Sequence, residues 1–348
     1  MNICFPYHSS IEGDKLKNLF LFAMILVLAF SFISCEGTDN NDDPDPVLLA
    51  YMPSILAVRI FDVTNPTAPA EVGSVYVANS ARGIAVKDNY AYTTNYNEAT
   101  FIAIDATDYK NPIIAGSCNL PDLGYRIKIS GYYAYVACTN AGLQIIDIST
   151  PGAPSVVGSY DTPDYCTGVD VVGDYAYLAD DHAFRIIDIS DKHAPTEVGS
   201  WAGLGPMGSL NSVVVAGEYA YVSDIDHTVR AFDISDPESP EMAGSETVGG
   251  NPVDVYMSGG TLYMVDWSET WVNGGIHAFS VDGPDLYEMG DYTPARFSAN
   301  NLVVSGNYAY ISSSVGFIII DVSNPTNMTE VVFLEPDFGF NDVALQWR

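Results

Sequence analysis

The sequence predicts an all-β fold, a seven-bladed β-propeller with four antiparallel strands in each blade. The first observation is a Tyr-Ala-Tyr-type strand that recurs every 42 to 47 residues. Its second aromatic falls at Tyr92, Tyr135, Tyr177, Tyr221, Tyr263 and Tyr310. An Ile-Ile-Asp-Ile-Ser-type strand follows each of them, and then a proline-bearing loop leads into a Val-Gly-Ser-type strand. Four short strands in a repeat of about 43 residues are typical of one propeller blade.

Six complete repeats lie between residues 82 and 334, and the two ends of the chain supply a seventh. We expect the inner strands at 83–86, 126–129, 168–171, 212–215, 254–257 and 301–304. Residues 48–75 hold strands two, three and four of a further repeat, and residues 341–347 (NDVALQW) supply a first strand. We therefore expect a composite blade from both termini, which leaves no open sheet edge in the ring.

An aspartate ends the third strand of most repeats, and we interpret it as a turn residue. It stands before Ser or Thr and a proline loop, where its carboxylate can accept hydrogen bonds from nearby backbone amides. Each copy lies on a different blade and points in a different direction, so the copies cannot act together as one catalytic site. The copies are Asp62, Asp105, Asp147, Asp188, Asp233 and Asp321, with Ser280 in the remaining repeat.

Composition excludes two classes of function. The formal net charge is −31, from 13 Lys and Arg against 44 Asp and Glu. Such a polyanion repels a phosphate backbone, so no nucleic-acid partner is expected. The five cysteines form no Cys-x-x-Cys or Cys/His cluster, which argues against a zinc site. They are Cys4, Cys35, Cys118, Cys138 and Cys166.

The N-terminal segment is expected to target the chain to the cell envelope. Lys15 and Lys17 precede an apolar run over 19–33, and Ser34 stands before Cys35. This order resembles a bacterial lipoprotein signal peptide, which implies that 1–35 is a signal segment with a lipid on Cys35. A transmembrane anchor is the alternative, although the run of about 15 residues is shorter than the roughly 20 that a span needs.

Residues 36–46 (EGTDNNDDPDP) are expected to form a disordered acidic tether, because they have almost no apolar side chains to bury. Acidic residues directly after the lipidated Cys35 resemble the surface-export signals of Bacteroidetes lipoproteins. The resemblance implies an outer-membrane lipoprotein on either the periplasmic or the cell-surface face. The membrane would be contacted through the lipid alone, and residues 47–348 would form the propeller domain as a monomer.

The third-strand sequences carry a further resemblance. LQIIDIS (143–149), FRIIDIS (184–190) and FIIIDVS (317–323), with the Pro-x-x-Pro loops that accompany such strands, resemble the LVIVD repeat. The resemblance covers nearly all of residues 48–348 and departs most after Gly249, where residues 267–275 form an insertion. It implies a bacterial or archaeal propeller that is either on the cell surface or secreted, and it transfers no catalytic residue.

The mouth of the central channel is the best candidate for a binding site. The residues that enter each inner strand are mostly polar, and they include Arg82 and Thr167. They would converge at one rim, where they are suited to a sugar or a cation and equally to ordered water. Two tryptophans stand in the long 266–275 loop beside them, and exposed Trp stacks on sugar rings. The candidate ligand-binding residues are Tyr125, Arg126, Asn211, Asp254, Trp267, Trp271, Asn300, Asn301, Asn341 and Asp342.

Two equivalent turns on neighbouring blades contain histidine beside aspartate. They carry Asp180, Asp181 and His182 in one blade and Asp224, Asp226 and His227 in the next. They either bracket a metal ion or are polar turn residues. We expect no cofactor, with Ca²⁺ or another divalent cation as the alternative.

The chain has no GxSxG, P-loop, HExxH or dinucleotide motif in a fitting context, so we expect a protein that is not an enzyme. The favoured hypothesis is a non-catalytic envelope lipoprotein whose propeller binds a protein partner or glycan through its rim and long loops. The alternative is an envelope polysaccharide hydrolase or lyase that uses Asp254 and Asp342, with Ca²⁺ as an aid. A purely architectural module is a third hypothesis.

Overall fold

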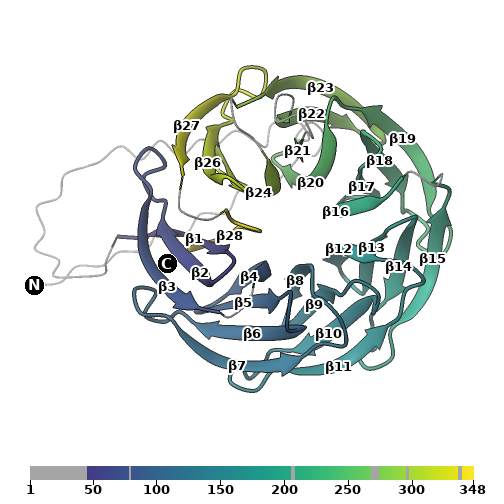
Figure 1. The fold of residues 1–348 in the computed structure, drawn as a ribbon. Helices are drawn as coiled ribbons and strands as arrows, with labels where there is room; N and C mark the ends of the chain where they lie inside the picture. The colour runs from purple at the N-terminus through teal and green to yellow at the C-terminus, as the bar shows by residue number, and fades with distance from the viewer. Residues whose placement is uncertain (1–44, 78–79, 205–207, 268–273, 295–297, 336–338) are drawn as a thin grey trace, which may run out of the picture. The chain divides into compact units, whose positions relative to one another are not determined.

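The computed structural model describes residues 45–77, 80–204, 208–267, 274–294, 298–335 and 339–348. Across these residues seven four-stranded antiparallel sheets form a ring (Figure 1), as the sequence predicts. The expected signal segment 1–35, the lipidation site Cys35 and nearly all of the tether 36–46 lie outside the described residues. No helix within the described ranges is long and apolar enough to span a membrane.

The first three complete blades follow one another along the chain after the composite one. The composite blade holds β28 (Ala344–Trp347), β1 (Leu48–Pro53), β2 (Ala57–Asp62) and β3 (Ala70–Tyr76). The next three hold β4 (Ala81–Lys87), β5 (Tyr90–Asn95), β6 (Thr100–Asp105) and β7 (Ile113–Asn119); β8 (Arg126–Ser130), β9 (Tyr133–Ala137), β10 (Leu143–Asp147) and β11 (Ser155–Tyr160); and β12 (Cys166–Val172), β13 (Tyr175–Asp180), β14 (Ala183–Asp188) and β15 (Thr196–Ala202).

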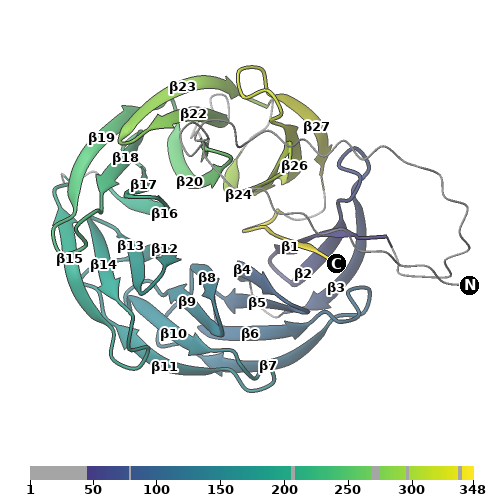
Figure 2. The same cartoon turned by 180° about the vertical axis from the view of Figure 1, so that it is seen from behind.

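The last three blades repeat the same strand order and complete the ring. They hold β16 (Leu210–Ala216), β17 (Tyr219–Asp224), β18 (Thr228–Asp233) and β19 (Glu241–Thr247); β20 (Asn251–Ser258), β21 (Thr261–Trp267), β22 (Ile276–Asp282) and β23 (Asp285–Tyr292); and β24 (Ala299–Ser305), β25 (Tyr308–Ser313), β26 (Gly316–Asp321) and β27 (Thr329–Leu334). Figure 2 shows the first strand of each blade on the inside of the ring and the fourth on the outside.

The two ends of the propeller close the ring within one sheet. β1 pairs with β28 from Leu48↔Trp347 to Tyr51↔Ala344. Next to the Leu48↔Trp347 pair, Val47 and Arg348 exchange two backbone hydrogen bonds of 2.8 Å each. The composite blade predicted from the two partial repeats is therefore confirmed.

The core lies between neighbouring blades, where the faces of adjacent sheets pack together. The repeated tyrosine of the second strand is buried because it stands in the middle of this layer; Tyr92 is 2% exposed. Its ring stacks on Phe101 of its own blade, with Val136 and Ile146 of the next blade in the same cluster. Cys118, Cys138 and Cys166 are free thiols.

The repeated aspartates have the turn role that the sequence predicts. In each case Oδ1 accepts the backbone N–H of the residue two positions later, at 2.8 to 3.0 Å. The six carboxylates cap six separate turns, so they do not form a shared site. The acceptors are Asp62, Asp105, Asp147, Asp188, Asp233 and Asp321.

A β-bulge interrupts the pairing at the entrance of five inner strands. The register breaks between Ala81/Ile84, Cys166/Gly168, Leu210/Ser212, Pro252/Asp254 and Ala299/Asn301. A bulge leaves a residue out of the ladder and re-aims its side chain. The residues set free in this way are Arg82 and Gly83, Thr167, Asn211, Val253 and Asn300, and most of them belong to the candidate site.

Candidate functional site

A cavity of about 240 Å³, called the mouth pocket below, lies where the inner strands begin. Four bulge residues contribute to its lining, one each from the bulges of β4, β16, β20 and β24. The lining consists of Arg82, Tyr125, Arg126, Asn211, Val253, Trp267, Ser298, Ala299, Asn300, Asn341 and Asp342. The structure thus brings seven of the ten candidate residues together: Tyr125, Arg126, Asn211, Trp267, Asn300, Asn341 and Asp342.

The other three candidates do not line this pocket. Asp254 and Asn301 lie deeper and line a second cavity of about 370 Å³ inside the ring, called the channel chamber below. Trp271 lies outside the described residues. The mouth pocket therefore contains fewer of the candidate residues than expected from the sequence, and its lining includes two arginines, Arg82 and Arg126.

The asparagines of the rim join neighbouring blades. Nδ2 of Asn300 donates to the Phe340 carbonyl at 2.7 Å, and Nδ2 of Asn341 donates to the Ala81 carbonyl at 2.6 Å. Asn211 makes a longer bond of 3.4 Å to the Pro252 carbonyl. Within the described residues, Oδ1 of Asn211 and of Asn341 receives no donor. These amides are thus partly structural and keep an acceptor for a ligand hydroxyl.

Arg126 on β8 contacts two residues of β20 and lines both cavities. Its Nη1 lies 2.9 Å from Oδ1 of Asp254, and its Nη2 donates to the Val253 carbonyl at 2.8 Å. The two strands belong to blades that are three positions apart in the ring. Arg126 and Asp342 each line both the mouth pocket and the channel chamber.

Asp254 has a structural role, because its contacts connect several inner strands. It is 3% exposed, and besides Arg126 its oxygens accept the Ser212 hydroxyl at 2.6 Å and the Leu302 N–H at 3.0 Å. Burial raises the pKa of this carboxyl, while Arg126 and Ser212 oppose the rise. Because its carboxylate is held by a direct ion pair with Arg126 and by the Ser212 hydroxyl, Asp254 is a poor choice for the catalytic carboxylate that the hydrolase hypothesis assigned to it.

Asp342 differs from Asp254 because no Lys or Arg of the described residues forms an ion pair with it. Its oxygens accept the backbone N–H groups of Ile84 at 3.0 Å and Val343 at 2.7 Å, and it lines both cavities. Burial raises the pKa of Asp342 to about 7, against the lowering effect of Arg126 and with a smaller rise from Asp254. A carboxyl with this pKa is present in both protonation states at neutral pH, as acid–base chemistry requires.

Arg82 stacks on aromatic rings at the pocket wall. Its guanidinium carbon lies 3.7 Å from the ring centroid of Tyr125 and 5.1 Å from that of Tyr96. The next residue must be glycine, because a Cβ on Gly83 would lie 2.6 Å from the Tyr125 carbonyl oxygen. The sequence places Arg82 at the rim, but nothing in the repeat predicts that it lies against these two rings.

In the two turns that contain histidine, two of the aspartates are paired with arginine, which favours the polar-turn interpretation for them. Asp180 lies 2.6 Å from Arg185, and Asp224 lies 2.7 Å from Arg230, so each is neutralised within its own blade. Nδ1 of His227 is 2.6 Å from the Gly250 carbonyl oxygen, which directs that ring to the backbone. Arginine on the third strand beside an aspartate at the end of the second is the sequence signal for these pairs.

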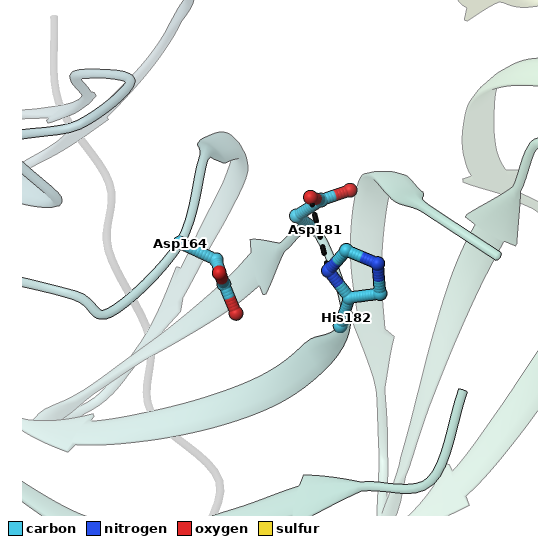
Figure 3. A group of neighbouring side chains, drawn as sticks. All are labelled: Asp164, Asp181 and His182. Atoms are coloured by element: carbon cyan, nitrogen blue, oxygen red, sulfur yellow. Dashed lines mark ion pairs between the residues drawn. The ribbon is translucent and has the colours of Figure 1, made fainter. Parts of the chain in front are cut away.

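A different group gathers around His182. Figure 3 shows Asp181 and His182 facing each other, with Asp164 of the preceding loop nearby. Their potential ligand atoms lie within 4.8 Å of one another, and Nδ1 of His182 is 3.0 Å from Oδ2 of Asp181. All three side chains are partly or fully exposed, and the ion pair accounts for the closest contact.

Comparison with solved structures finds propellers of diverse roles. A candidate 6-phosphogluconolactonase from Bacteroides fragilis shares 14% identity at a TM-score of 0.74, over 88% of this chain and 100% of that one. The periplasmic gluconolactonase PpgL of Pseudomonas aeruginosa shares 12% at 0.71, over 86% and 98%. BamB from Moraxella catarrhalis shares 13% at 0.57, over 84% of each chain. These identities establish the fold alone.

The comparisons correct one expectation from the sequence. We predicted that the chain is not an enzyme because familiar catalytic motifs are missing, but two similar propellers bear lactonase names. That contradicts the prediction, since the absence of those motifs does not separate this chain from propellers with hydrolase names. No curated protein matches the sequence.

The repeats themselves identify the family. The model of the LVIVD repeat matches residues 58–77, 78–120, 125–162, 165–202, 207–248 and 298–333. It passes over the blade that contains β20 to β23, which is the blade whose sequence departs most from the pattern. These matches span more than half of the sequence, and the chain therefore belongs to the LVIVD-repeat family.

Proposed function

We propose that the mouth pocket is the active site of a hydrolase that opens a small ester or lactone, with Asp342 as the general base. The observation that carries this proposal is a pocket-lining carboxyl whose pKa burial raises to about 7. Proton transfer is most efficient when the pKa of the catalytic group lies near the working pH. Asp342 satisfies this condition without a metal ion or a histidine.

The proposed reaction uses groups that face the pocket. The Asp342 carboxylate takes a proton from a water molecule as the water oxygen attacks the carbonyl carbon of the substrate. The ring C–O bond then breaks, and the protonated Asp342 returns the proton to the leaving oxygen. Arg126 lines the same pocket, and its positive charge is suited to stabilise the negative charge that develops on the carbonyl oxygen.

The dimensions of the site favour a small molecule over a polymer. The cavity of about 240 Å³ matches a sugar-sized compound, and the Arg126–Asp254 ion pair joins the inner strands β8 and β20. The lactonase names of two similar propellers agree with this substrate size. We therefore replace the polysaccharide of the sequence-based hypothesis with a sugar-sized ester or lactone.

The substitution Asp342→Asn tests the proposal. We expect the full chain to hydrolyse at least one member of a panel of aldonolactones and sugar esters, followed by acid release at constant pH. The variant should lose about 10²- to 10⁴-fold in kcat, because a neutral amide cannot accept the proton. Asp164→Asn changes an acid that lies between β11 and β12 and outside the pocket lining, so it is the matched control and should keep the parent rate.

Two results would contradict the proposed reaction. One is a panel in which no compound reacts faster than it does without protein. The other is an Asp342→Asn variant that hydrolyses substrate at the parent rate, since the carboxyl would then play no part.

We also propose that the chain is a lipoprotein of the cell envelope, anchored through Cys35. Lys15, Lys17, the apolar run over 19–33 and Ser34 before Cys35 support it. Cells that express the chain should incorporate a labelled fatty acid into it, and Cys35→Ser should abolish the label. Equal labelling of both forms would show that Cys35 carries no lipid.

A further inference from the structure

Arg82 stands apart from the other arginines that the structure describes. Among the described residues, Arg59, Arg126, Arg185 and Arg230 each form an ion pair with a carboxylate. Arg348 donates to Gln346, Asn89 and the Tyr51 hydroxyl. Within the same part of the chain, Arg82 has no carboxylate within 4.0 Å and makes no hydrogen bond. An arginine without an acceptor is unexpected in a protein with 44 acidic residues.

The guanidinium of Arg82 is nevertheless held in place. The ring faces of Tyr125 and Tyr96 lie 3.7 and 5.1 Å from its central carbon, and the two rings contact each other edge to face. Stacking orients a guanidinium through its planar face and leaves the N–H groups at its edge free. Arg82 is therefore fixed in orientation while its hydrogen-bond donors remain unused at the wall of the mouth pocket.

The nearby acids do not cancel this charge. Asp254 is already paired with Arg126, and the pKa of Asp342 is raised to about 7, so that carboxyl is partly neutral at neutral pH. The net charge of −31 repels anions at long range, so an anion needs a specific local partner to bind here. Arg82 provides that partner inside a pocket of molecular size.

We propose that Arg82 recognises an anionic group, a carboxylate or a phosphate, on the small molecule that occupies the mouth pocket. A planar guanidinium with free edge donors fits either group with two parallel hydrogen bonds. Oδ1 of Asn211 and Oδ1 of Asn341 accept hydroxyl groups from the same ligand, which makes an acidic or phosphorylated polyhydroxy compound the substrate class. The statement that this compound is the substrate rests on the proposed function. The binding of an anion by Arg82 does not.

The test measures binding of four probes to the full chain by calorimetry. The probes are inorganic phosphate, D-gluconate, 6-phospho-D-gluconate and neutral D-glucose, compared among the parent, Arg82→Gln and Arg59→Gln. Arg59→Gln removes the same charge from an ion pair with Glu71 on β2 and β3, away from the pocket lining. Thermal unfolding of each variant checks that the propeller is intact.

We expect the anionic probes to bind the parent and Arg59→Gln alike, and to bind Arg82→Gln about tenfold more weakly or worse. Glucose binding, whether weak or absent, should not change. The ranking of gluconate and its 6-phosphate shows which anionic group Arg82 prefers. Failure of every anionic probe to bind the parent overturns the proposal. So does unchanged anion affinity in Arg82→Gln, or an equal loss for glucose.

The two proposals fail separately. If anion binding depends on Arg82 but no lactone is hydrolysed, the recognition role stands and the hydrolase is wrong. If lactones are hydrolysed through Asp342 at a rate that Arg82→Gln leaves unchanged for charged and neutral substrates, the reaction stands and the recognition role is wrong.

Discussion

Deletion of residues 344–348 is expected to destroy the cooperative fold of the propeller. The deletion removes β28, so β1 loses its partner from Leu48 to Tyr51, together with the backbone bonds between Val47 and Arg348. At about 1 kcal/mol per hydrogen bond, with the lost packing of Leu345 added, the free energy of unfolding should fall by about 5–8 kcal/mol. That is comparable to the whole stability of a typical domain.

Urea unfolding followed by fluorescence measures this effect. Trp347→Ser is the control, because Trp347 is 58% exposed and its loss leaves the backbone pairing intact. A synthetic peptide of residues 340–348 should restore part of the stability when added to the deleted chain. An unfolding midpoint equal to that of the full chain would show that the ring does not depend on this closure.

Substitution of Arg126 is expected to have the second-largest effect. Arg126→Met keeps most of the side-chain volume but leaves Asp254 buried without its cation. Removal of one partner from a buried ion pair typically costs about 3–5 kcal/mol. Because Arg126 also lowers the pKa of Asp342, the same substitution should raise that pKa above about 7.

The double variant Arg126→Met, Asp254→Asn separates the charge effect from packing. An uncharged amide at position 254 needs no cation, so the double variant should recover much of the stability that the Arg126→Met variant loses. Chemical unfolding of the parent, both single variants and the double variant closes the cycle. If the loss of stability in the double variant equals the sum of the losses in the two single variants, the ion pair between Arg126 and Asp254 contributes nothing to the fold.

The architecture was predictable from the sequence because every repeat carries the same buried positions. The tyrosine at a step of 42 to 47 residues marks the buried second strand, and the partial repeats at 48–75 and 341–347 define how the ring closes. The rim was also predictable, since the residue before each inner strand occupies the same bulge in most blades. Asn211 and Asn300 are examples that the structure places in the mouth pocket.

Contacts between non-neighbouring blades were not predictable from the repeat. The Arg126–Asp254 bridge joins strands three blades apart, and it exists because the ring brings their inner strands face to face. Burial of Asp342, which raises its pKa, likewise depends on the closed ring. Arg82 illustrates the same limit, since its partners Tyr96 and Tyr125 come from loops whose course the strand pattern does not define.

The titration of Asp342 tests the central claim most directly. Carbon-13 NMR of the full chain, labelled at aspartate carboxyls and assigned with Asp342→Asn, gives the pKa of this group. We expect a midpoint near 7, which makes hydrolysis rise with pH through the same range as the carboxylate form accumulates. A midpoint near the ordinary value of 3.8 would contradict the proposed role. The pKa of Asp342 would then lie too far below neutral pH for efficient general-base catalysis.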